Sequence, residues 1–202
     1  MATRSERSPL PVDIVPLTSE RVEDLAALFA EGGDPKNCWC AFWRVRGSSW
    51  KEWTAEKNRP VVEGLAGRDP APGLVAYADG GATPVGWVSL GPRGDFERLA
   101  RSKVLAPIDD RPVWSIVCFV VSRSVRGRGV ARALLAAAVD YARDHGAATL
   151  EAYPVDPSRG RVPAASAFMG PMPMYEKAGF RLVARRQWNA TTPVRPIVRR
   201  EL

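Results

Sequence analysis

The sequence predicts an α/β or α+β fold built on a mixed β-sheet. The apolar segment 113–121 is the strongest candidate strand, and its continuous hydrophobic character predicts burial on both faces. Residues 126–146 carry an apolar stripe at helical spacing, and residues 148–153 form another apolar strand candidate. Strand, helix and strand in this order predict a β–α–β unit with parallel strands. A second such unit is expected over 148–184.

The length of the chain, 202 residues, suits one domain. We assign residues 11–202 to this domain and expect residues 1–10, which are polar and basic, to form a disordered tail. The composition is 46% hydrophobic and 25% charged, as in globular proteins. No apolar run is long enough to span a membrane, and the first residues lack the apolar segment of a secretory signal. We therefore expect no membrane association.

The cysteines and the net charge bear on compartment and partners. Cys38, Cys40 and Cys118 are too few for a disulfide framework and fit a reduced, cytoplasmic protein. With His145 they lack the spacing of a zinc site, so we expect no metal. The net charge of +7 indicates an acidic partner, namely a polyphosphate cofactor, a nucleic acid or an anionic membrane, or else reflects genome composition alone, because arginine is scattered through the chain. The arginines form no dense run with interleaved aromatics, which makes nucleic acid less favoured.

The first half of the chain predicts a strand, two helical stretches and a β-hairpin. Thr18 is the expected N-cap of the first helix, and Gly32-Gly33 ends it. Pro60 is expected to divide the second helical stretch, because proline interrupts helical hydrogen bonding. The predicted elements are a strand over 12–17, a helix over 22–29, an aromatic-rich loop over 34–46, a helical stretch from about Ser48 that carries Trp50 and Trp53, a segment over 61–65, and strands over 74–78 and 85–90 joined by an Asp79-Gly80-Gly81 turn.

The second half contains the β–α–β unit and a long loop. A connection over 93–112, with one helical turn near 96–99, leads into the strand at 113–121. The loop over 154–173 contains glycine, proline and serine, and loops of this length are usually functional or disordered. The last predicted elements are a short helix over 174–178 and strands over 180–184 and 194–198.

Residues 126–131, Arg-Gly-Arg-Gly-Val-Ala, carry the clearest chemical signal. They form a glycine turn between a buried strand and the start of a helix, where backbone amides are free and the helix dipole favours negative charge. Gly127 and Gly129 let the backbone approach an anion, and Arg126 and Arg128 add positive charge. The turn therefore predicts a phosphate or pyrophosphate site.

Two common nucleotide-binding motifs do not fit this turn. The chain contains no G-x-x-x-x-G-K-[ST] string, which excludes a Walker loop. The dinucleotide fingerprint would continue from Gly127-x-Gly129 to a glycine or alanine where this chain has Arg132, a bulky side chain at a point of close packing.

A third motif fits. Arg126-x-x-Gly129-x-Ala131 matches the R/Q-x-x-G-x-G/A signature of the GCN5-related N-acetyltransferases (GNAT), and the chain resembles this family. The string at 174–180, Met-Tyr-Glu-Lys-Ala-Gly-Phe, is also similar to the family's cofactor-binding half. The resemblance is specific over about residues 113–184 and is topological before them.

The resemblance implies a mostly antiparallel central sheet flanked by helices, with a splayed strand pair at the cofactor site. It implies acetyl-coenzyme A as the co-substrate. The backbone of the strand before the turn would bind the pantetheine arm, and the turn would bind the pyrophosphate. The matching residues are Phe119, Val120 and Val121 in the strand, and Arg126, Gly127, Arg128, Gly129, Val130 and Ala131 in the turn.

The resemblance also implies catalytic roles. Tyr175 stands where the family often has a general acid that protonates the departing thiolate, and a phenol is apt because its pKa of about 10 lies near that of a thiol. The alternative is that its ring only packs. Some relatives have a glutamate that acts as the general base on the strand that here reads Trp-Ser-Ile-Val-Cys over 114–118. This chain has no acidic residue there.

Glu151 is the best substitute base, because a carboxylate in an apolar strand lies either on an exposed edge or in a cleft that raises its pKa. Asp109 and Asp110 are weaker candidates. A base that acts through water, or no dedicated base at all, remains an alternative.

The segment Cys-Trp-Cys-Ala-Phe-Trp-Arg over 38–44 is a candidate acceptor site. Trp39 and Trp43 would form an apolar or cation-binding wall, or would equally close the core under the helices. The loop 154–173 would cover the acceptor.

The leading hypothesis for function is an acetyl-CoA-dependent N-acetyltransferase in which an amine attacks the thioester directly. The acceptor would be a small-molecule amine or a peptide, and a homodimer is compatible with the resemblance. The alternative is a non-catalytic acyl-CoA-binding or sensor module of the same fold.

Overall fold

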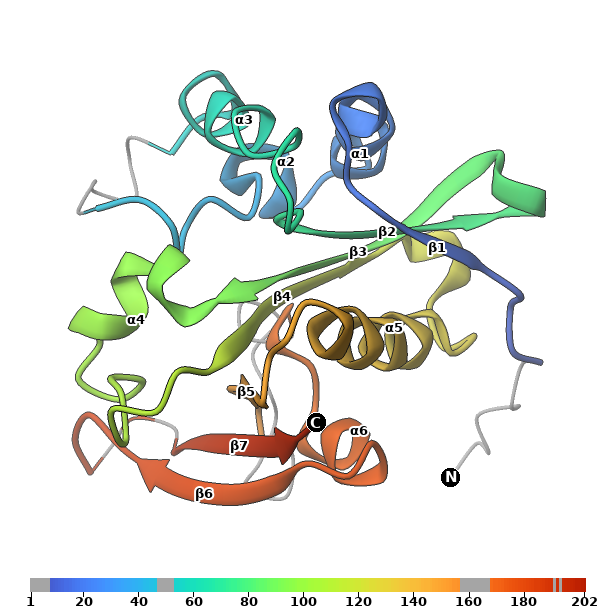
Figure 1. The fold of residues 1–202 in the computed structure, drawn as a ribbon. Coiled ribbons are helices and arrows are strands. Elements are labelled where there is room, and N and C mark those ends of the chain that lie inside the picture. Colours follow the sequence, from blue (N-terminus) through green and yellow to red (C-terminus); the bar gives the residue numbers. More distant parts are fainter. Residues whose placement is uncertain (1–7, 47–52, 157–167, 191, 193) are drawn as a thin grey trace.

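A seven-stranded sheet forms the centre of the computed structural model, which describes residues 8–46, 53–156, 168–190, 192 and 194–202 (Figure 1). The strand order is β1-β2-β3-β4-β5-β7-β6, and neighbouring strands are antiparallel except β4 and β5, which are parallel. The strands are β1 (Asp13–Pro16), β2 (Gly73–Ala78), β3 (Thr83–Pro92), β4 (Trp114–Val121), β5 (Thr149–Ala152), β6 (Arg181–Arg186) and β7 (Arg195–Glu201). The predicted mixed, mostly antiparallel sheet is confirmed.

Helices cover both faces of the sheet (Figure 1). One face carries the N-terminal helices, and the other carries α5 and α6. Each face has its own apolar cluster, because α5 and α6 bury their apolar side chains on one side and α1 buries its own on the other. The helices are α1 (Val22–Ala30), α2 (Pro35–Cys38), α3 (Ala55–Glu63), α4 (Glu97–Arg101), α5 (Val130–Asp144) and α6 (Met172–Lys177), with 3-10 turns η1 (Ser19–Arg21), η3 (Asp79–Gly81), η4 (Arg93–Asp95) and η5 (Arg123–Val125).

The first predicted β–α–β unit is confirmed as β4–α5–β5. The two parallel strands pair only from Trp114 opposite Leu150 to Ile116 opposite Ala152. β4 then continues to Val121, paired with β3 alone, while β5 ends. The strands therefore part after three residue pairs, which gives the expected splayed pair.

A β-bulge lies in β4 at the point where the strands part. Ser89 of β3 pairs with Cys118 and Leu90 pairs with Ile116, so Val117 has no partner in β3. An extra residue shifts the alternation of side chains along a strand. Val117 and Cys118 consequently both face the cluster under α1, and Phe119 faces the cluster under α5.

The second predicted β–α–β unit is wrong in its pairing. β6 lies at the edge of the sheet, and β7 inserts between β5 and β6, antiparallel to both. β7, the last strand in the sequence, is therefore an internal strand of the sheet and separates β5 from β6.

The N-terminal half differs from the prediction in two places. The region expected to be a loop, 34–46, contains the short helix α2, and α3 runs through Pro60 without a break. Pro60 is exposed near the exposed Glu56, so the carbonyl that loses its hydrogen bond faces solvent. The helix expected to begin at Ser48 falls largely outside the described residues.

Residues 8–10, at the end of the expected tail, contact the glycine turn. Leu10 donates a backbone hydrogen bond to the Arg128 carbonyl at 2.9 Å, and the Arg128 guanidinium reaches the Ser8 carbonyl. The end of the tail therefore lies on the glycine turn that the sequence singles out.

Candidate active site

The glycine turn at residues 126–131 presents free backbone donors at the start of α5. Gly127 and Gly129 have φ values of 81° and 84°, in the left-handed region that glycine tolerates. In the described part of the chain, only one of these six amides, that of Arg128, donates to an acceptor, the Val125 carbonyl. The other five amides stand at the positive end of a 15-residue helix. This arrangement can hold a phosphate or pyrophosphate group.

The two arginines of the turn use their side chains locally. Arg126 donates from Nε to the Val121 carbonyl at 3.2 Å, which ties the turn back to β4. Arg128 leans toward the N-terminal segment. Both side chains retain donor nitrogens, and the guanidinium of Arg126 lies at the exposed surface.

Helix α5 packs very closely on the sheet behind this turn. A Cβ on Gly86 of β3 would stand 2.8 Å from the Val130 side chain and 2.9 Å from that of Leu134. Only glycine permits this approach, so Gly86 helps to set the position of the helix N-terminus relative to β4.

Tyr175 of α6 lies close to β4. Its ring is 6.4 Å from the ring of Phe119 and 5.3 Å from that of Phe180, both edge-on. The side chain is fully buried, and its hydroxyl donates to the Met169 carbonyl at 2.9 Å. Burial raises the pKa of Tyr175 well above its ordinary value, with a smaller contribution from Cys118, so the phenol keeps its proton at neutral pH.

Glu151 lies in neither of the two environments expected for it. Its side chain is fully buried at the β4–β5 junction, opposite Ser115. One carboxylate oxygen accepts from Arg93 and from the Tyr153 hydroxyl, and the other accepts from Arg199 Nε at 2.8 Å. The prediction of an exposed edge or an open cleft is therefore wrong, because the sequence pattern did not reveal the arginines.

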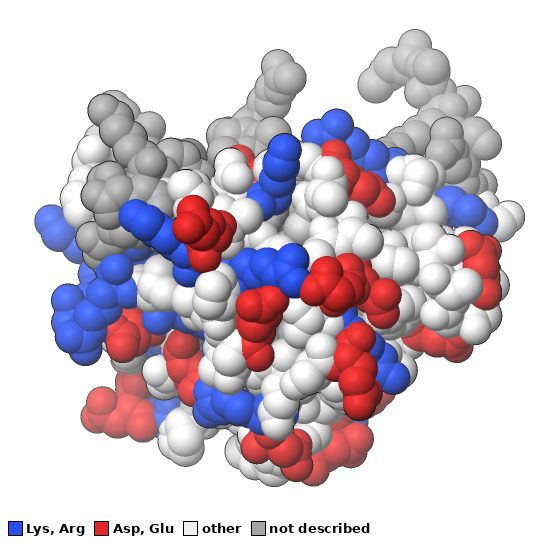
Figure 2. Space-filling model, turned by 90° about the horizontal axis from the view of Figure 1, so that it is seen from above, with Lys and Arg blue, Asp and Glu red and all other residues white. Residues whose placement is uncertain are grey.

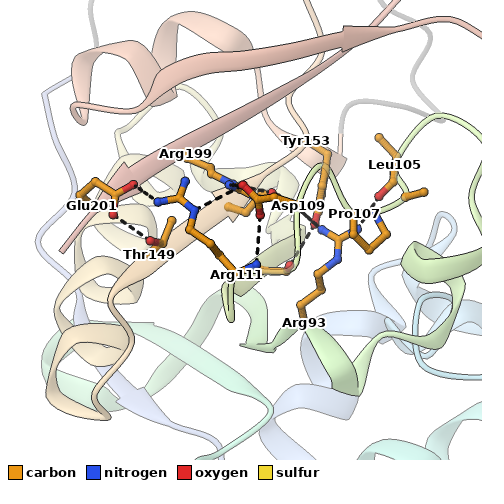
Figure 3. Close-up of polar contacts among 12 residues, drawn as sticks. Arg93, Leu105, Pro107, Asp109, Arg111, Thr149, Tyr153, Arg199 and Glu201 are labelled. Atoms are coloured by element: carbon orange, nitrogen blue, oxygen red, sulfur yellow. Dashed lines mark hydrogen bonds and ion pairs between the residues drawn. The ribbon is translucent and has the colours of Figure 1, made fainter.

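The network around Glu151 extends to the connection before β4 (Figure 3). Arg199 also donates two hydrogen bonds, of 2.6 and 2.9 Å, to the carboxylate of Asp109. These hydrogen bonds hold the pKa of Asp109 well below its ordinary value. Arg93 donates to the Leu105 carbonyl at 2.6 Å and to the Tyr153 hydroxyl at 2.6 Å. The acids and arginines thus hold the connection against β5 and β7.

Of the two weaker base candidates, the structure ties Asp109 into this network, while Asp110 lies exposed beside it. Arg93, Arg199 and Tyr153 were missed as partners of Glu151. Arg199 directly follows Ile197 and Val198 and is buried with them in the last strand, and a buried arginine is usually paired with an acid. Arg93 stands in a connection and carries no such signal.

Trp39 and Trp43 lie in the apolar cluster under α1. Trp39 is 4% exposed, stacks edge-on against Phe29 at 5.3 Å and lies under the Arg59 guanidinium. Trp43 is 8% exposed and meets Phe42 edge-on at 4.8 Å. Of the two alternatives for these side chains, the core is the one that the packing favours.

Two further observations concern partners. Within the described ranges, no three His, Cys, Asp or Glu side chains are grouped to hold a metal ion, and no helix has both the length and the apolarity to cross a membrane. Acidic and basic side chains alternate over the face in Figure 2, without a large basic area on that face.

The fold and the turn define a protein of the acetyltransferase class. The sequence profile of the Acetyltransferase (GNAT) family matches residues 39–180. The chain therefore belongs to the GNAT family, whose members are N-acetyltransferases, as the motif at 126–131 predicts.

Solved structures with the same fold span nearly the whole chain. A Drosophila melanogaster polyamine N-acetyltransferase that forms N-acetylagmatine has a TM-score of 0.58 at 11% identity, covering 95% of this chain and 100% of its own. A putative GNAT acetyltransferase from Desulfovibrio desulfuricans has a TM-score of 0.57 at 18% identity, covering 95% and 99%. The NatC complex bound to Gag peptide and CoA has a TM-score of 0.54 at 14% identity, covering 96% and 99%. No curated protein sequence matches significantly.

Proposed function

We propose that this chain transfers an acetyl group from acetyl-CoA to the amine of a small molecule or a peptide. The observation that carries the proposal is the set of five free amides at the N-terminus of α5, directly after the strand that parts from β5. The fold supplies the place for the cofactor, and this turn supplies the donors that a pyrophosphate needs.

In this proposal, the turn residues Arg126 to Ala131 hold the pyrophosphate through their backbone. The backbone of Phe119, Val120 and Val121 binds the pantetheine arm, since β4 has no β5 partner there. The thioester would then lie near Phe119 and Tyr175, whose rings are in contact.

Tyr175 is the proposed proton donor. An ordinary phenol already carries its proton at neutral pH, and burial raises the pKa of Tyr175 further, so the hydroxyl donates only once the departing thiolate lies within hydrogen-bond reach. The Met169 carbonyl orients the hydroxyl before reaction. The acceptor amine attacks the thioester directly in its neutral form, and its proton passes to solvent.

We do not assign the base to Glu151. Its carboxylate already accepts from three donors, two of them arginines, so both of its oxygens are engaged within the protein and neither is presented to an incoming amine. Glu151 instead supports the β4–β5 junction. The protein is proposed to work in the cytoplasm, where its cysteines would stay mainly reduced.

Calorimetric titration with acetyl-CoA tests the proposal. Gly129→Glu places a carboxylate at the turn, where a Cβ meets nothing closer than 3.7 Å, so the variant can fold while repelling a pyrophosphate. Gly80→Glu is the matched control: Gly80 also has a positive φ, 66°, and has open space around it, but lies in the β2–β3 hairpin.

We expect the native protein and Gly80→Glu to bind, and Gly129→Glu to lose about 100-fold or more in affinity, equivalent to about 3 kcal/mol. Equal binding by all three proteins would place the cofactor elsewhere, and no binding by the native protein would refute the proposal. Free-thiol release with agmatine and with a peptide N-terminus then tests the acceptor class, since similar folds act on such amines.

A further inference from the structure

Two cysteines from distant parts of the chain meet between the α2–α3 loop and β4. The Sγ atoms of Cys40 and Cys118 are 3.2 Å apart, although the residues are 78 positions apart in sequence. Both thiols are free and buried, while Cys38 is partly exposed. A sequence pattern alone could not pair them.

The backbone on each side aims these thiols at one another. In a regular strand, Cys118 would point to the side of the sheet opposite Val117. The bulge at Val117 instead turns Cys118 toward the α1 side, where Val117 also lies. On the facing loop, Trp39 and Cys40 have φ values of 49° and 52°, an unfavourable left-handed conformation for two successive residues with side chains. Such backbone outliers concentrate at functional sites.

The loop that carries Cys40 is also held firmly. Trp39 packs edge-on against Phe29 of α1 and lies under the Arg59 guanidinium of α3. The amides of Trp39 and Ala41 bond to the carbonyls of Pro35 and Cys38. The loop therefore presents Cys40 in one position, so little entropy is lost when the sulfurs join.

We propose that Cys40 and Cys118 are a redox-active dithiol that forms a reversible disulfide. The oxidant is hydrogen peroxide. One thiol attacks the peroxide, its sulfur is oxidised to a sulfenic acid, and one water leaves. The second thiol then attacks that sulfur, the S–S bond forms, and a second water leaves. The two thiols together lose two electrons and two protons, which reduce the peroxide to two waters.

The resting protein is stable against this reaction. Burial, together with the neighbouring Cys40, raises the pKa of Cys38 to about 12, and the hydrogen bond from Cys40 and burial raise the pKa of Cys118. At neutral pH these groups are thiols, which react slowly. The disulfide is therefore expected under sustained oxidant and not in air over minutes.

The disulfide would act on the neighbouring cofactor strand. The S–S bond is about 2.05 Å long, so the two sulfurs must approach by about 1 Å, and this strains the side chains and the contact between the loop and β4. Cys118 precedes Phe119, which we propose to bind the pantetheine arm. This consequence rests on the proposed function: oxidation should lower acetyl transfer by at least tenfold, since small misplacements of reacting groups cost this much.

Thiol counting tests the dithiol without any reference to activity. The native protein is treated with hydrogen peroxide and divided into two portions. In one portion the free thiols are counted in denaturant, and the other is blocked with iodoacetamide in denaturant and digested for peptide mapping. We expect three thiols to fall to one, a peptide linking Cys40 to Cys118, and recovery of all three with dithiothreitol. Loss of no thiols, or a Cys38–Cys40 link, would overturn the proposal.

Variants separate the pair from the third cysteine. Cys38→Ser should still form the disulfide, with two thiols falling to none. Cys118→Ala and Cys40→Ala should each keep both of their remaining thiols under the same peroxide treatment. If one of these variants fails to fold, the other still provides the test. If peroxide reversibly lowers acetyl transfer by the native protein but not by Cys40→Ala, the disulfide acts on the proposed cofactor site. If the reduced native protein fails to bind acetyl-CoA, only the proposed function falls, and the thiol count still decides the dithiol.

Discussion

Replacement of Glu151 by glutamine distinguishes a structural carboxylate from a catalytic one. The substitution keeps the size of the side chain but removes the charge that faces Arg93 and Arg199, whose side chains are 13% and 4% exposed. Loss of one partner from a buried ion pair costs about 3–5 kcal/mol, because a charge is left buried without compensation. This is a large share of the roughly 5–15 kcal/mol that stabilises a typical domain.

The matched control is Glu201→Gln. Glu201 belongs to the same group of contacts, through Arg111 and Thr149, but its side chain is 67% exposed (Figure 3). An exposed pair is worth about 0–1 kcal/mol. The two variants thus apply one chemical change at the buried and the exposed end of the same network.

Urea unfolding followed by tryptophan fluorescence measures the difference. With a slope of about 2 kcal/mol per molar urea, Glu151→Gln should lower the midpoint by about 2 M, and Glu201→Gln by less than about 0.5 M. Acetyl transfer by the folded fraction of Glu151→Gln should stay within about tenfold of native. An unchanged midpoint together with a loss of kcat/KM of about 100-fold or more, and of the acid limb of the pH–rate profile, would refute this reasoning and identify Glu151 as the base.

Three further predictions concern other parts of the site. Tyr175→Phe should lower kcat, measured by thiol release, by about 10²- to 10⁴-fold, and should leave the affinity for acetyl-CoA, measured by calorimetry, unchanged. An undiminished kcat would show that Tyr175 is not the proton donor and that its ring only packs. Gly86→Ala should destabilise the fold by about 1–3 kcal/mol in urea, since its Cβ would overlap Val130. The depressed pKa of Asp109 stabilises the fold above its ordinary value of 3.8, and this contribution is lost as pH falls below that value. Asp109→Asn should therefore flatten the acid side of a plot of Tm against pH.

The cofactor half of the fold could be predicted because its signals are local. The apolar strand at 114–121, the glycine turn and the periodic helix each depend on neighbours within a few residues, and each lies where the sequence indicates. The hairpin at Asp79–Gly81 follows from turn chemistry of the same kind.

The remaining features depend on contacts between distant segments. β7 lies between β5 and β6, and the sequence of this strand does not predict which strands it pairs with. The partners of Glu151 come from a connection and from the C-terminal strand, so its environment could not be read from the apolar residues beside it. Pro60 was misjudged because an exposed helix can lose one hydrogen bond to solvent at small cost.

The separation of two apolar clusters by one sheet bears on how such proteins diversify. The glycine turn, α5 and Tyr175 belong to one face, and the aromatic loop with Trp39 and Trp43 belongs to the other. Substitutions on the loop face can accumulate with little effect on the packing that positions α5, because the sheet lies between the loop and that helix. Under the proposed function, the loop face can therefore change in evolution while the α5 face, with its glycine turn, is conserved.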